Sequence, residues 1–193
     1  MKKLFILLTM MAAILGSCGC DSDLNKVYSF VGDSLIARWD LSYFFPACLT
    51  RNDGVSGSGV QYLESLGGKY AGGRVVVLSG TNDLGLVPSG DEQAYAERFV
   101  EAVANLGAGR VIVISIPPRS KNWCHNELDD NTRIRIMNAS IAKECGTRPG
   151  FTYVDVFDLL LRDGYLNGEY THDGLHMSEQ GYEIITKKIK DIL

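Results

Sequence analysis

A serine, a histidine and an aspartate stand in settings that suit nucleophilic chemistry. Ser34 lies in Gly32-Asp33-Ser34-Leu35, where an apolar run ends and a helix is expected to begin. Asp173 and His176 are three residues apart, just before the last helical pattern of the chain. A serine hydroxyl becomes an effective nucleophile when a histidine takes its proton and a carboxylate orients that histidine. The three residues therefore predict acyl transfer through a covalent intermediate on Ser34.

Each part of this set has a simpler interpretation when it is taken alone. Ser34 would also suit the N-cap of a helix, and the Asp173–His176 pair would suit a capping arrangement in a turn. His172 lies next to Asp173 and could compete for the role of base. Side chains of neighbouring residues in an extended chain point apart, however, so the spacing favours His176.

A site that hydrolyses esters also needs hydrogen-bond donors for the oxygen that becomes negatively charged. Asn82 lies in Gly80-Thr81-Asn82-Asp83, directly after a β-rich run, and could present its side-chain amide. Gly54 lies in Asn52-Asp53-Gly54-Val55-Ser56-Gly57, after another such run, and would let a backbone N–H approach a substrate closely. Each motif alone is also an ordinary turn sequence, because Asn-Asp and Asp-Gly pairs favour turns.

Taken together and in this order, the four motifs resemble those of the GDSL/SGNH hydrolase superfamily, which is named for Ser, Gly, Asn and His residues of its site. The resemblance covers nearly the whole chain after its first 26 residues. It implies that Ser34 is the nucleophile, that His176 is the general base and then the acid, and that Asp173 orients His176.

The resemblance also implies how the negative charge is held. The expected oxyanion hole consists of the backbone N–H groups of Ser34 and Gly54 and the side chain of Asn82. Asp33 and Asp83 are expected to do structural work in their turns. Water completes the reaction by releasing the acyl group, and neither a metal ion nor an organic cofactor is expected.

Alternating β-rich and helical patterns predict the frame that brings these motifs together. Five strands are expected, at residues 27–31, 48–51, 74–79, 110–116 and 151–156, with the clearest helices at 92–106, 131–145 and 178–193. Such alternation predicts parallel strands with right-handed crossovers, that is, a three-layer α/β/α sandwich with a five-stranded parallel sheet. The resemblance makes this a flavodoxin-like SGNH hydrolase fold. Ligands in such sheets bind beyond the carboxyl ends of the strands, where all four motifs lie.

Two further segments are candidates for the substrate-binding surface. Residues 117–130 form the longest expected loop, which contains Lys121, Trp123, Cys124 and His125 and could form a wall or lid. Shortly after Ser34 come Arg38 and the aromatic residues Trp39, Tyr43 and Phe44. The aromatic side chains could provide a surface for a sugar ring. Their helical spacing favours a place in the core instead.

The first 26 residues predict export and lipid anchoring. Lys2 and Lys3 precede an apolar run of about a dozen residues, which is typical of a signal peptide and shorter than a membrane span. Leu15-Gly16-Ser17-Cys18 resembles the lipobox of bacterial lipoproteins, in which the cysteine is acylated. We therefore expect a signal peptide at 1–17, an acylated tether at 18–26 with its lipid on Cys18, and a hydrolase domain at 27–193. This predicts a location in the bacterial cell envelope; a plain secretory signal is the alternative.

Composition and cysteine content narrow the remaining possibilities. Without residues 1–17 the chain carries 17 basic and 23 acidic residues, a net charge of −6, and no basic patch suggests nucleic-acid binding. Four cysteines besides Cys18 could form disulfides in an oxidising compartment, with three pairings open; they are Cys20, Cys48, Cys124 and Cys145. Their spacing does not fit a zinc site.

The sequence predicts a serine esterase but fixes its substrate less sharply. A short chain leaves little room for a deep acyl tunnel, which favours short acyl groups such as acetyl, on a small molecule or a glycan. A lipid hydrolase of the lysophospholipase or thioesterase type is an alternative. So is a carbohydrate-binding lipoprotein that keeps the fold without the chemistry. The number of subunits is left open.

Overall fold

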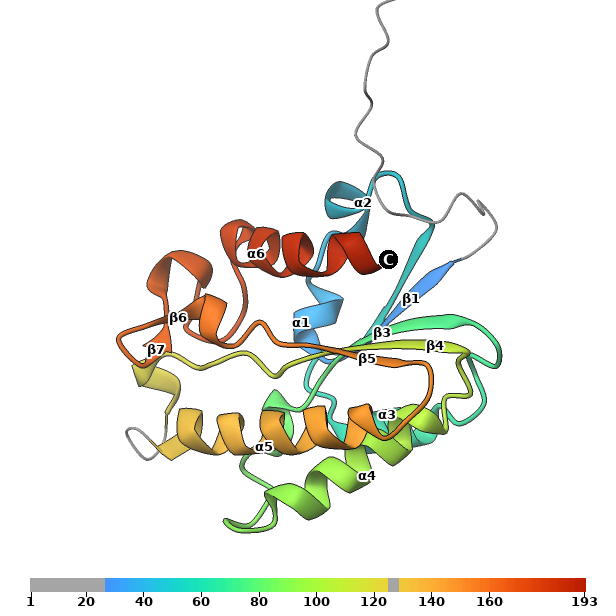
Figure 1. Cartoon of the computed structure of the whole chain (residues 1–193). Helices are drawn as coiled ribbons and strands as arrows, with labels where there is room; N and C mark the ends of the chain where they lie inside the picture. Colours follow the sequence, from blue (N-terminus) through green and yellow to red (C-terminus); the bar gives the residue numbers. More distant parts are fainter. Residues whose placement is uncertain (1–26, 125–128) are drawn as a thin grey trace, which may run out of the picture.

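The computed structural model describes residues 27–124 and 129–193, and its centre is a five-stranded parallel sheet (Figure 1). The strands lie in the order β2-β1-β3-β4-β5 and are β1 (Tyr28–Gly32), β2 (Thr50–Gly54), β3 (Arg74–Leu78), β4 (Arg110–Ile114) and β5 (Phe151–Val154). This is the flavodoxin-like order of a doubly wound α/β fold. The predicted fold class is therefore confirmed, and helices lie on both sides of the sheet.

The second strand departs most from the prediction. It begins at Thr50 instead of Cys48 and continues to Gly54, because its backbone pairs with β1 as far as Gly32 opposite Gly54. Gly54 is therefore part of the sheet, and the loop that approaches the nucleophile begins only at Val55. This shift matters for the oxyanion hole described below.

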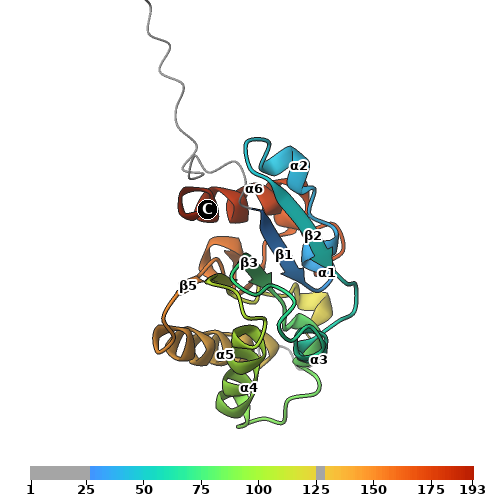
Figure 2. The same cartoon turned by 90° about the vertical axis from the view of Figure 1, so that its right-hand side faces the viewer.

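Two hydrophobic clusters hold the helices against the two faces of the sheet. Along β3, Val75 and Val77 belong to one cluster, whereas Val76 and Leu78 belong to the other, as expected for an interior strand that is covered on both faces. The helices α3 (Val60–Ser65), α4 (Glu92–Ala104) and α5 (Asp129–Gly146) cover one face, as Figure 2 shows. The opposite face carries α1 (Ser34–Ala37), α2 (Leu41–Phe44) and α6 (Glu179–Ile189).

The three long helices agree with the predicted patterns. The apolar faces of α4 and α5 are buried. In α4 the buried residues include Tyr95, Phe99, Val100 and Val103. In α5 they include Ile134, Met137, Ile141 and Cys145. Ser178 caps α6, because its hydroxyl accepts a hydrogen bond from the Gly181 N–H. The cap fixes the start of α6 at Glu179, three residues after His176.

Short elements that the patterns did not predict lie between the long ones. A two-stranded hairpin consists of β6 (Leu161–Arg162) and β7 (Tyr165–Leu166), with positive φ angles at both turn residues, Asp163 and Gly164. Five 3₁₀ helices complete the described elements: η1 (Thr81–Asp83), η2 (Lys121–Trp123), η3 (Asp158–Leu160), η4 (Gly168–Tyr170) and η5 (Lys190–Ile192). Of these, η1 and η2 position residues of the site.

Several predictions fall on residues 1–26 and 125–128, which lie outside the described residues. These are the signal peptide, the lipidated Cys18, the tether, Cys20 and His125. Among the other cysteines, Cys48 is disulfide-bonded, whereas Cys124 and Cys145 are free, so these last two are not paired with each other. Within residues 27–124 and 129–193, no helix has both the length and the apolar character needed to cross a membrane.

Candidate active site

Ser34 sits at the carboxyl edge of the sheet, on a sharp turn between β1 and α1. Gly32 has a φ of 156°, and a Cβ at this position would lie 1.9 Å from the Leu78 carbonyl oxygen of β3, so only glycine fits. Asp33 is the N-cap of α1 and accepts the Leu35 N–H at 2.9 Å. The simpler interpretation of Ser34 as the N-cap is therefore wrong. Ser34 is the first residue of α1, is 4% exposed, and has its hydroxyl free for other contacts.

A hydrogen-bonded chain joins Ser34 to the loop that precedes α6. His176 Nε2 lies 3.0 Å from Ser34 Oγ, and His176 Nδ1 lies 2.6 Å from Asp173 Oδ2. These distances match a nucleophile in contact with a base that is itself oriented by a carboxylate. The structure thus brings together the three residues that the sequence analysis selected, from positions 142 residues apart.

Hydrogen bonds favour the ionised form of the Asp173 carboxyl group, which is partly exposed. Desolvation alone would raise its pKa, but hydrogen bonds from the His176 ring and from the backbone N–H groups of His176 and Leu175 lower the pKa to about 2. The two N–H bonds are 2.8 and 3.0 Å long and both reach Oδ1, which leaves Oδ2 for the imidazole. His172 is exposed, and the imidazole hydrogen-bonded to Ser34 Oγ is that of His176, so His172 does not take its place.

The segment between Arg119 and Trp123, which we call the strap, ties two parts of the site together. The Trp123 indole N–H donates to the Asp173 carbonyl oxygen at 2.7 Å, and the Ser120 N–H donates to Gly174 at 2.9 Å. At its other end the Arg119 guanidinium donates to the Thr81 carbonyl oxygen. Part of the predicted loop is therefore a wall that contacts both the acid-base loop and the Asn82 turn. The sequence analysis did not assign these contacts.

Asn82 lies in η1, directly beyond β3. Its Nδ2 donates one hydrogen bond to the Ser58 carbonyl oxygen at 2.8 Å, which leaves the second amide hydrogen available. The neighbouring Asp83 fixes this turn, because its Oδ2 accepts the Val60 N–H at 2.9 Å and the Tyr95 hydroxyl at 2.7 Å. Asp83 thus performs a structural role between α3 and α4.

Gly54 does not occupy the position that an oxyanion donor needs, and this prediction requires correction. Its N–H donates to Asn52 Oδ1 at 3.0 Å, and a Cβ at residue 54 would lie 2.3 Å from the Ala37 nitrogen. Gly54 thus lets β2 pack tightly against α1, while its N–H is already bonded. The sequence analysis placed the end of β2 too early, which put Gly54 beyond the strand instead of inside it.

Gly57, unlike Gly54, has open surroundings and a backbone N–H without a hydrogen-bond partner among the described residues. It is exposed, its φ is 79°, and a Cβ there would meet nothing within 4 Å of the described residues. Its neighbour Ser58 is anchored on both sides, to the Gly32 carbonyl oxygen by its hydroxyl and to Asn82 by its own carbonyl oxygen. In the described part of the chain, neither the Gly57 N–H nor the Ser34 N–H has a hydrogen-bond partner. Both donors flank the nucleophile turn.

Asp33 lies directly behind the nucleophile in a very different setting from Asp173. It is fully buried, and its Oδ2 has no hydrogen-bond partner among the described residues. Burial raises the pKa of Asp33 to about 7, with a further contribution from the charge of Asp83, although backbone N–H groups partly offset the effect. Asp33 therefore exchanges its proton near neutral pH, within the interior of the protein.

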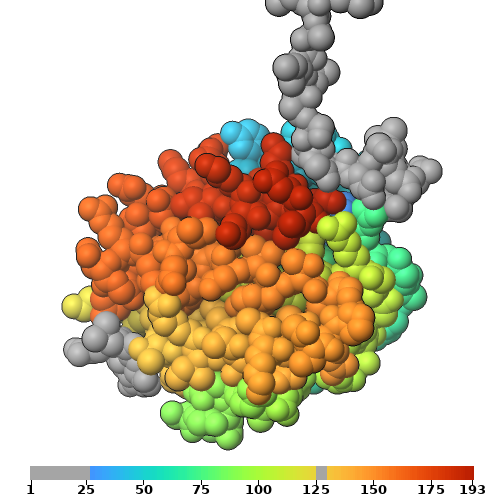
Figure 3. Space-filling view, in the orientation of Figure 1, coloured from blue at the N-terminus to red at the C-terminus, as the bar shows by residue number. Residues whose placement is uncertain are grey.

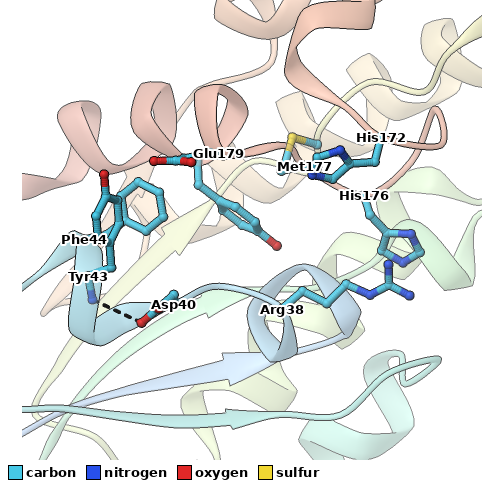
Figure 4. A pocket seen from close by; sticks show the side chains of 9 residues that line it. Arg38, Asp40, Tyr43, Phe44, His172, His176, Met177 and Glu179 are labelled. Atoms are coloured by element: carbon cyan, nitrogen blue, oxygen red, sulfur yellow. Dashed lines mark hydrogen bonds between the residues drawn. The ribbon is translucent and has the colours of Figure 1, made fainter.

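Two cavities lie on either side of this candidate site. The first, of about 410 Å³, is shown in Figure 4 and is lined by Arg38, Asp40, Tyr43, Phe44, His172, His176, Met177, Glu179 and Tyr182. The second, of about 370 Å³, lies on the Asn82 side and includes Trp123 and Arg119. Of the aromatic residues considered in the sequence, Trp39 is buried in the core, whereas Tyr43 and Phe44 line the first cavity. No group of side chains suited to a metal ion occurs within the described ranges.

The fold and this constellation together define a hydrolase of the α/β/α type with a serine at the end of its first strand. Residues 30–184 match the model of the GDSL-like lipase/acylhydrolase family. The chain therefore belongs to this family, and the resemblance seen in its motifs is confirmed.

Individual relatives share this architecture at modest sequence identity. A Streptococcus pneumonia protein proposed to be a platelet activating factor is 27% identical, with a TM-score of 0.70 over 90% of this chain and 86% of that protein. An acetyl xylan esterase from Geobacillus stearothermophilus has a TM-score of 0.55 at 16% identity, over 87% and 94% of the two chains.

A third relative is larger. The N-acylneuraminate cytidylyltransferase of Escherichia coli O18:K1:H7 is 26% identical in an alignment of 176 positions that covers 86% of this chain and 40% of that enzyme. The chain thus spans less than half the length of this relative.

Proposed function

We propose that this acylhydrolase is a serine esterase that works through an acyl-enzyme on Ser34. The observation that carries the proposal is the continuous chain of contacts from Ser34 Oγ through the His176 ring to Asp173 Oδ2, at 3.0 and 2.6 Å. Such a chain gives the hydroxyl a base and gives the base a fixed orientation.

The proposed reaction has two halves. Ser34 Oγ attacks the ester carbonyl carbon while its proton moves to His176 Nε2, and the carbonyl oxygen becomes an oxyanion. The C–O bond to the alcohol then breaks, and the alcohol leaves with the proton from His176. Water attacks the acyl group in the same way, with His176 as the base, and releases the carboxylic acid and free Ser34. Asp173 stays ionised throughout and stabilises the imidazolium.

For the oxyanion we propose donors that differ in one position from the sequence-based set. The Ser34 N–H stays in the set, because it is the unpaired first N–H of α1. Asn82 stays because its amide has a second hydrogen to donate. The free N–H of Gly57 replaces that of Gly54, which is bonded to Asn52.

For the substrate we propose a short acyl group, such as acetyl, on a carbohydrate. Open cavities with aromatic walls favour this choice, since Tyr43 and Phe44 line the cavity beside His176 and can stack on a sugar ring. The Geobacillus neighbour, an acetyl xylan esterase, is an example of this fold with a carbohydrate ester. The Escherichia coli relative is named for an N-acylneuraminate, which is also a carbohydrate.

The test is hydrolysis of p-nitrophenyl esters of increasing chain length by the full-length chain, with Ser34→Ala alongside. We expect turnover of the acetate that falls with chain length and is lost in Ser34→Ala. Turnover that rises with chain length would instead favour a lipid hydrolase of the lysophospholipase or thioesterase type. No turnover from folded protein would overturn the esterase proposal and favour a non-catalytic carbohydrate-binding protein.

We further propose that the hydrolase domain is exported and anchored to a membrane by lipid on Cys18. The support is the signal-like segment and the lipobox-like residues that precede the domain. In a bacterial host, the wild-type chain should partition into the detergent phase and incorporate labelled fatty acid. Cys18→Ser should do neither, and equal labelling of both chains would contradict the proposal.

A further inference from the structure

Arg38 lies one helical turn after Ser34 and faces the same side of α1. Its backbone N–H donates to the Ser34 carbonyl oxygen at 3.0 Å, which fixes the start of its side chain relative to the nucleophile. In Figure 4 the side chain extends toward His176, and both residues line the cavity of about 410 Å³. A guanidinium group therefore lies beside the reacting centre.

This guanidinium has no partner in the part of the chain that the structure describes. Arg38 is exposed and takes part in no ion pair or side-chain hydrogen bond there. Other arginines near the site are bonded: Arg119 pairs with Asp130, and Arg133 pairs with Glu92. The charge of Arg38 is thus not paired with any other side chain of the described residues.

Two acids line the same cavity, but each is already occupied. Asp40 caps α2 and accepts hydrogen bonds from the Ser42 hydroxyl at 2.6 Å and the Tyr43 N–H at 3.1 Å. Interaction with the Glu179 carboxylate is the main cause of the raised pKa of the Tyr43 hydroxyl. Figure 4 shows Glu179 and Tyr43 toward one end of the cavity and Arg38 with His176 toward the other. The guanidinium of Arg38 therefore lies at the end of the cavity nearest His176, apart from Glu179.

We infer that this cavity is a subsite for the alcohol part of an anionic ester, in which Arg38 binds a carboxylate or phosphate group of the substrate. The inference rests on the proposed esterase function and extends it from the acyl group to the leaving alcohol. A guanidinium group suits this role because its planar donors can bind both oxygens of a carboxylate or phosphate at once. Tyr43 and Phe44, which are at least partly exposed, supply the wall for the apolar face of a sugar ring.

If Arg38 binds an anionic group of the substrate, the protein should select an anionic sugar ester over a matched neutral one. A suitable set is acetylated galacturonate, acetylated galactose and acetylated galactose 6-phosphate, with the acetyl group at one shared position. The measured quantity is kcat/KM for each anionic ester divided by kcat/KM for the neutral one. Wild-type protein should give a ratio well above one, and Arg38→Gln should lower it by about tenfold to a hundredfold, as expected for the loss of a charged hydrogen bond.

The two anionic esters distinguish the sources of negative charge. A high ratio for the galacturonate ester alone identifies a carboxylate subsite, and a high ratio for the phosphate ester alone identifies a phosphate subsite. Arg162→Gln is the matched control, because Arg162 is an exposed arginine in β6 that does not line this cavity, and its ratios should equal those of the wild type. A ratio near one in wild-type protein, or equal ratios in wild type and Arg38→Gln, would overturn the inference.

Binding measurements separate failure of the subsite from failure of the esterase. Calorimetric titration of the wild-type chain with galacturonate, galactose and galactose 6-phosphate needs no turnover. Binding of an anionic sugar that is weakened about tenfold or more in Arg38→Gln would support the subsite even if no ester were hydrolysed. Equal binding of charged and neutral sugars, or equal binding by both proteins, would contradict it.

Discussion

The active site combines a buried half at the sheet edge with a half on a surface loop. Ser34, Asp33 and Asn82 follow strands β1 and β3, and their turns are held by contacts with neighbouring strands and helices. Asp173 and His176 lie on a loop whose bonds are mostly local and whose outer support is the strap. The comparison shows that Ser34 is placed by the core, whereas His176 is placed by a few hydrogen bonds.

The two aspartates show the same contrast in their protonation. Burial raises the pKa of Asp33 to about 7, whereas hydrogen bonds from His176 and the loop backbone outweigh desolvation and lower the pKa of Asp173 to about 2. Carboxyl groups on either side of one nucleophile thus carry different charge near neutral pH. Such divergence arises from environment rather than residue type, and it separates a structural acid from one suited to orient a base.

The largest expected effect on kcat comes from a substitution in the loop that carries Asp173 and His176. Asp173→Asn should lower kcat for p-nitrophenyl acetate by about 10³-fold or more, because an amide neither selects the required tautomer of His176 nor stabilises its charged form. Asp191→Asn, at an exposed position near the C-terminus, is the control and should leave kcat unchanged. Retention of more than a tenth of the wild-type kcat in Asp173→Asn would exclude the proposed role.

In the sheet-edge half, Asn82→Ala should lower kcat by about 10²-fold to 10³-fold, the range found when one oxyanion donor is removed. KM should change much less, since the lost bond forms mainly in the transition state. Asn105→Ala, an exposed asparagine at the end of α4, serves as the comparison and should behave like the wild type. An effect of Asn82→Ala on KM alone would assign Asn82 to substrate binding instead.

The raised pKa of Asp33 predicts that the folded protein becomes less stable as the pH rises from about 4 to about 7. The folded protein keeps the Asp33 proton up to pH about 7, whereas the unfolded chain loses it near pH 4. The stabilising contribution of protonated Asp33 is therefore full below pH 4 and is lost as the pH rises to 7. Asp33→Asn keeps an N-cap acceptor but cannot ionise, so its melting temperature relative to wild type should rise by several degrees between pH 4 and pH 8.

Asp173 should act on stability in the opposite direction. Its contribution is present above pH 4 and is lost as the pH falls toward 2, so Asp173→Asn should differ most from wild type above pH 4. Thermal unfolding of both variants across this range measures the contrast directly. Parallel curves for wild type and Asp33→Asn would show that Asp33 is not a proton-holding group.

The smallest expected effect concerns the strap. Trp123→Phe removes the indole N–H that bonds the Asp173 carbonyl oxygen but keeps an aromatic ring at the edge of the second cavity. The loss of one such bond should lower kcat by about fivefold and leave KM nearly unchanged. A change in KM without a change in kcat would indicate that Trp123 contacts substrate and does not position Asp173.

Much of the molecule could be predicted from its sequence, because strong local patterns agree with the tertiary structure. The runs at 74–79 and 110–116 are apolar on both faces, which only an interior parallel strand explains well, and both are strands of the sheet. The family motifs selected Ser34, Asp173 and His176, which the fold brings within hydrogen-bonding distance, because the order and spacing of motifs carry information that single residues do not.

The errors arose where tertiary pairing decides the outcome. Gly54 and Gly57 both suit a turn by sequence, and only the pairing of β2 with β1 shows which N–H stays free. The hairpin of β6 and β7 was missed because each strand has two residues, too few for a period to be seen. The contacts of Trp123 with Asp173 and of Arg119 with Thr81 join segments that are far apart in the chain, and no local pattern signals them.

The most direct test of the central claim is labelling with a fluorophosphonate, which forms a stable bond only with an activated serine. The account predicts one adduct per chain by intact mass, located on Ser34 by peptide mapping. Labelling should be absent in Ser34→Ala and slowed by orders of magnitude in His176→Ala. A folded wild-type protein that gains no adduct, or gains one at another serine, would contradict the assignment of Ser34 as the nucleophile.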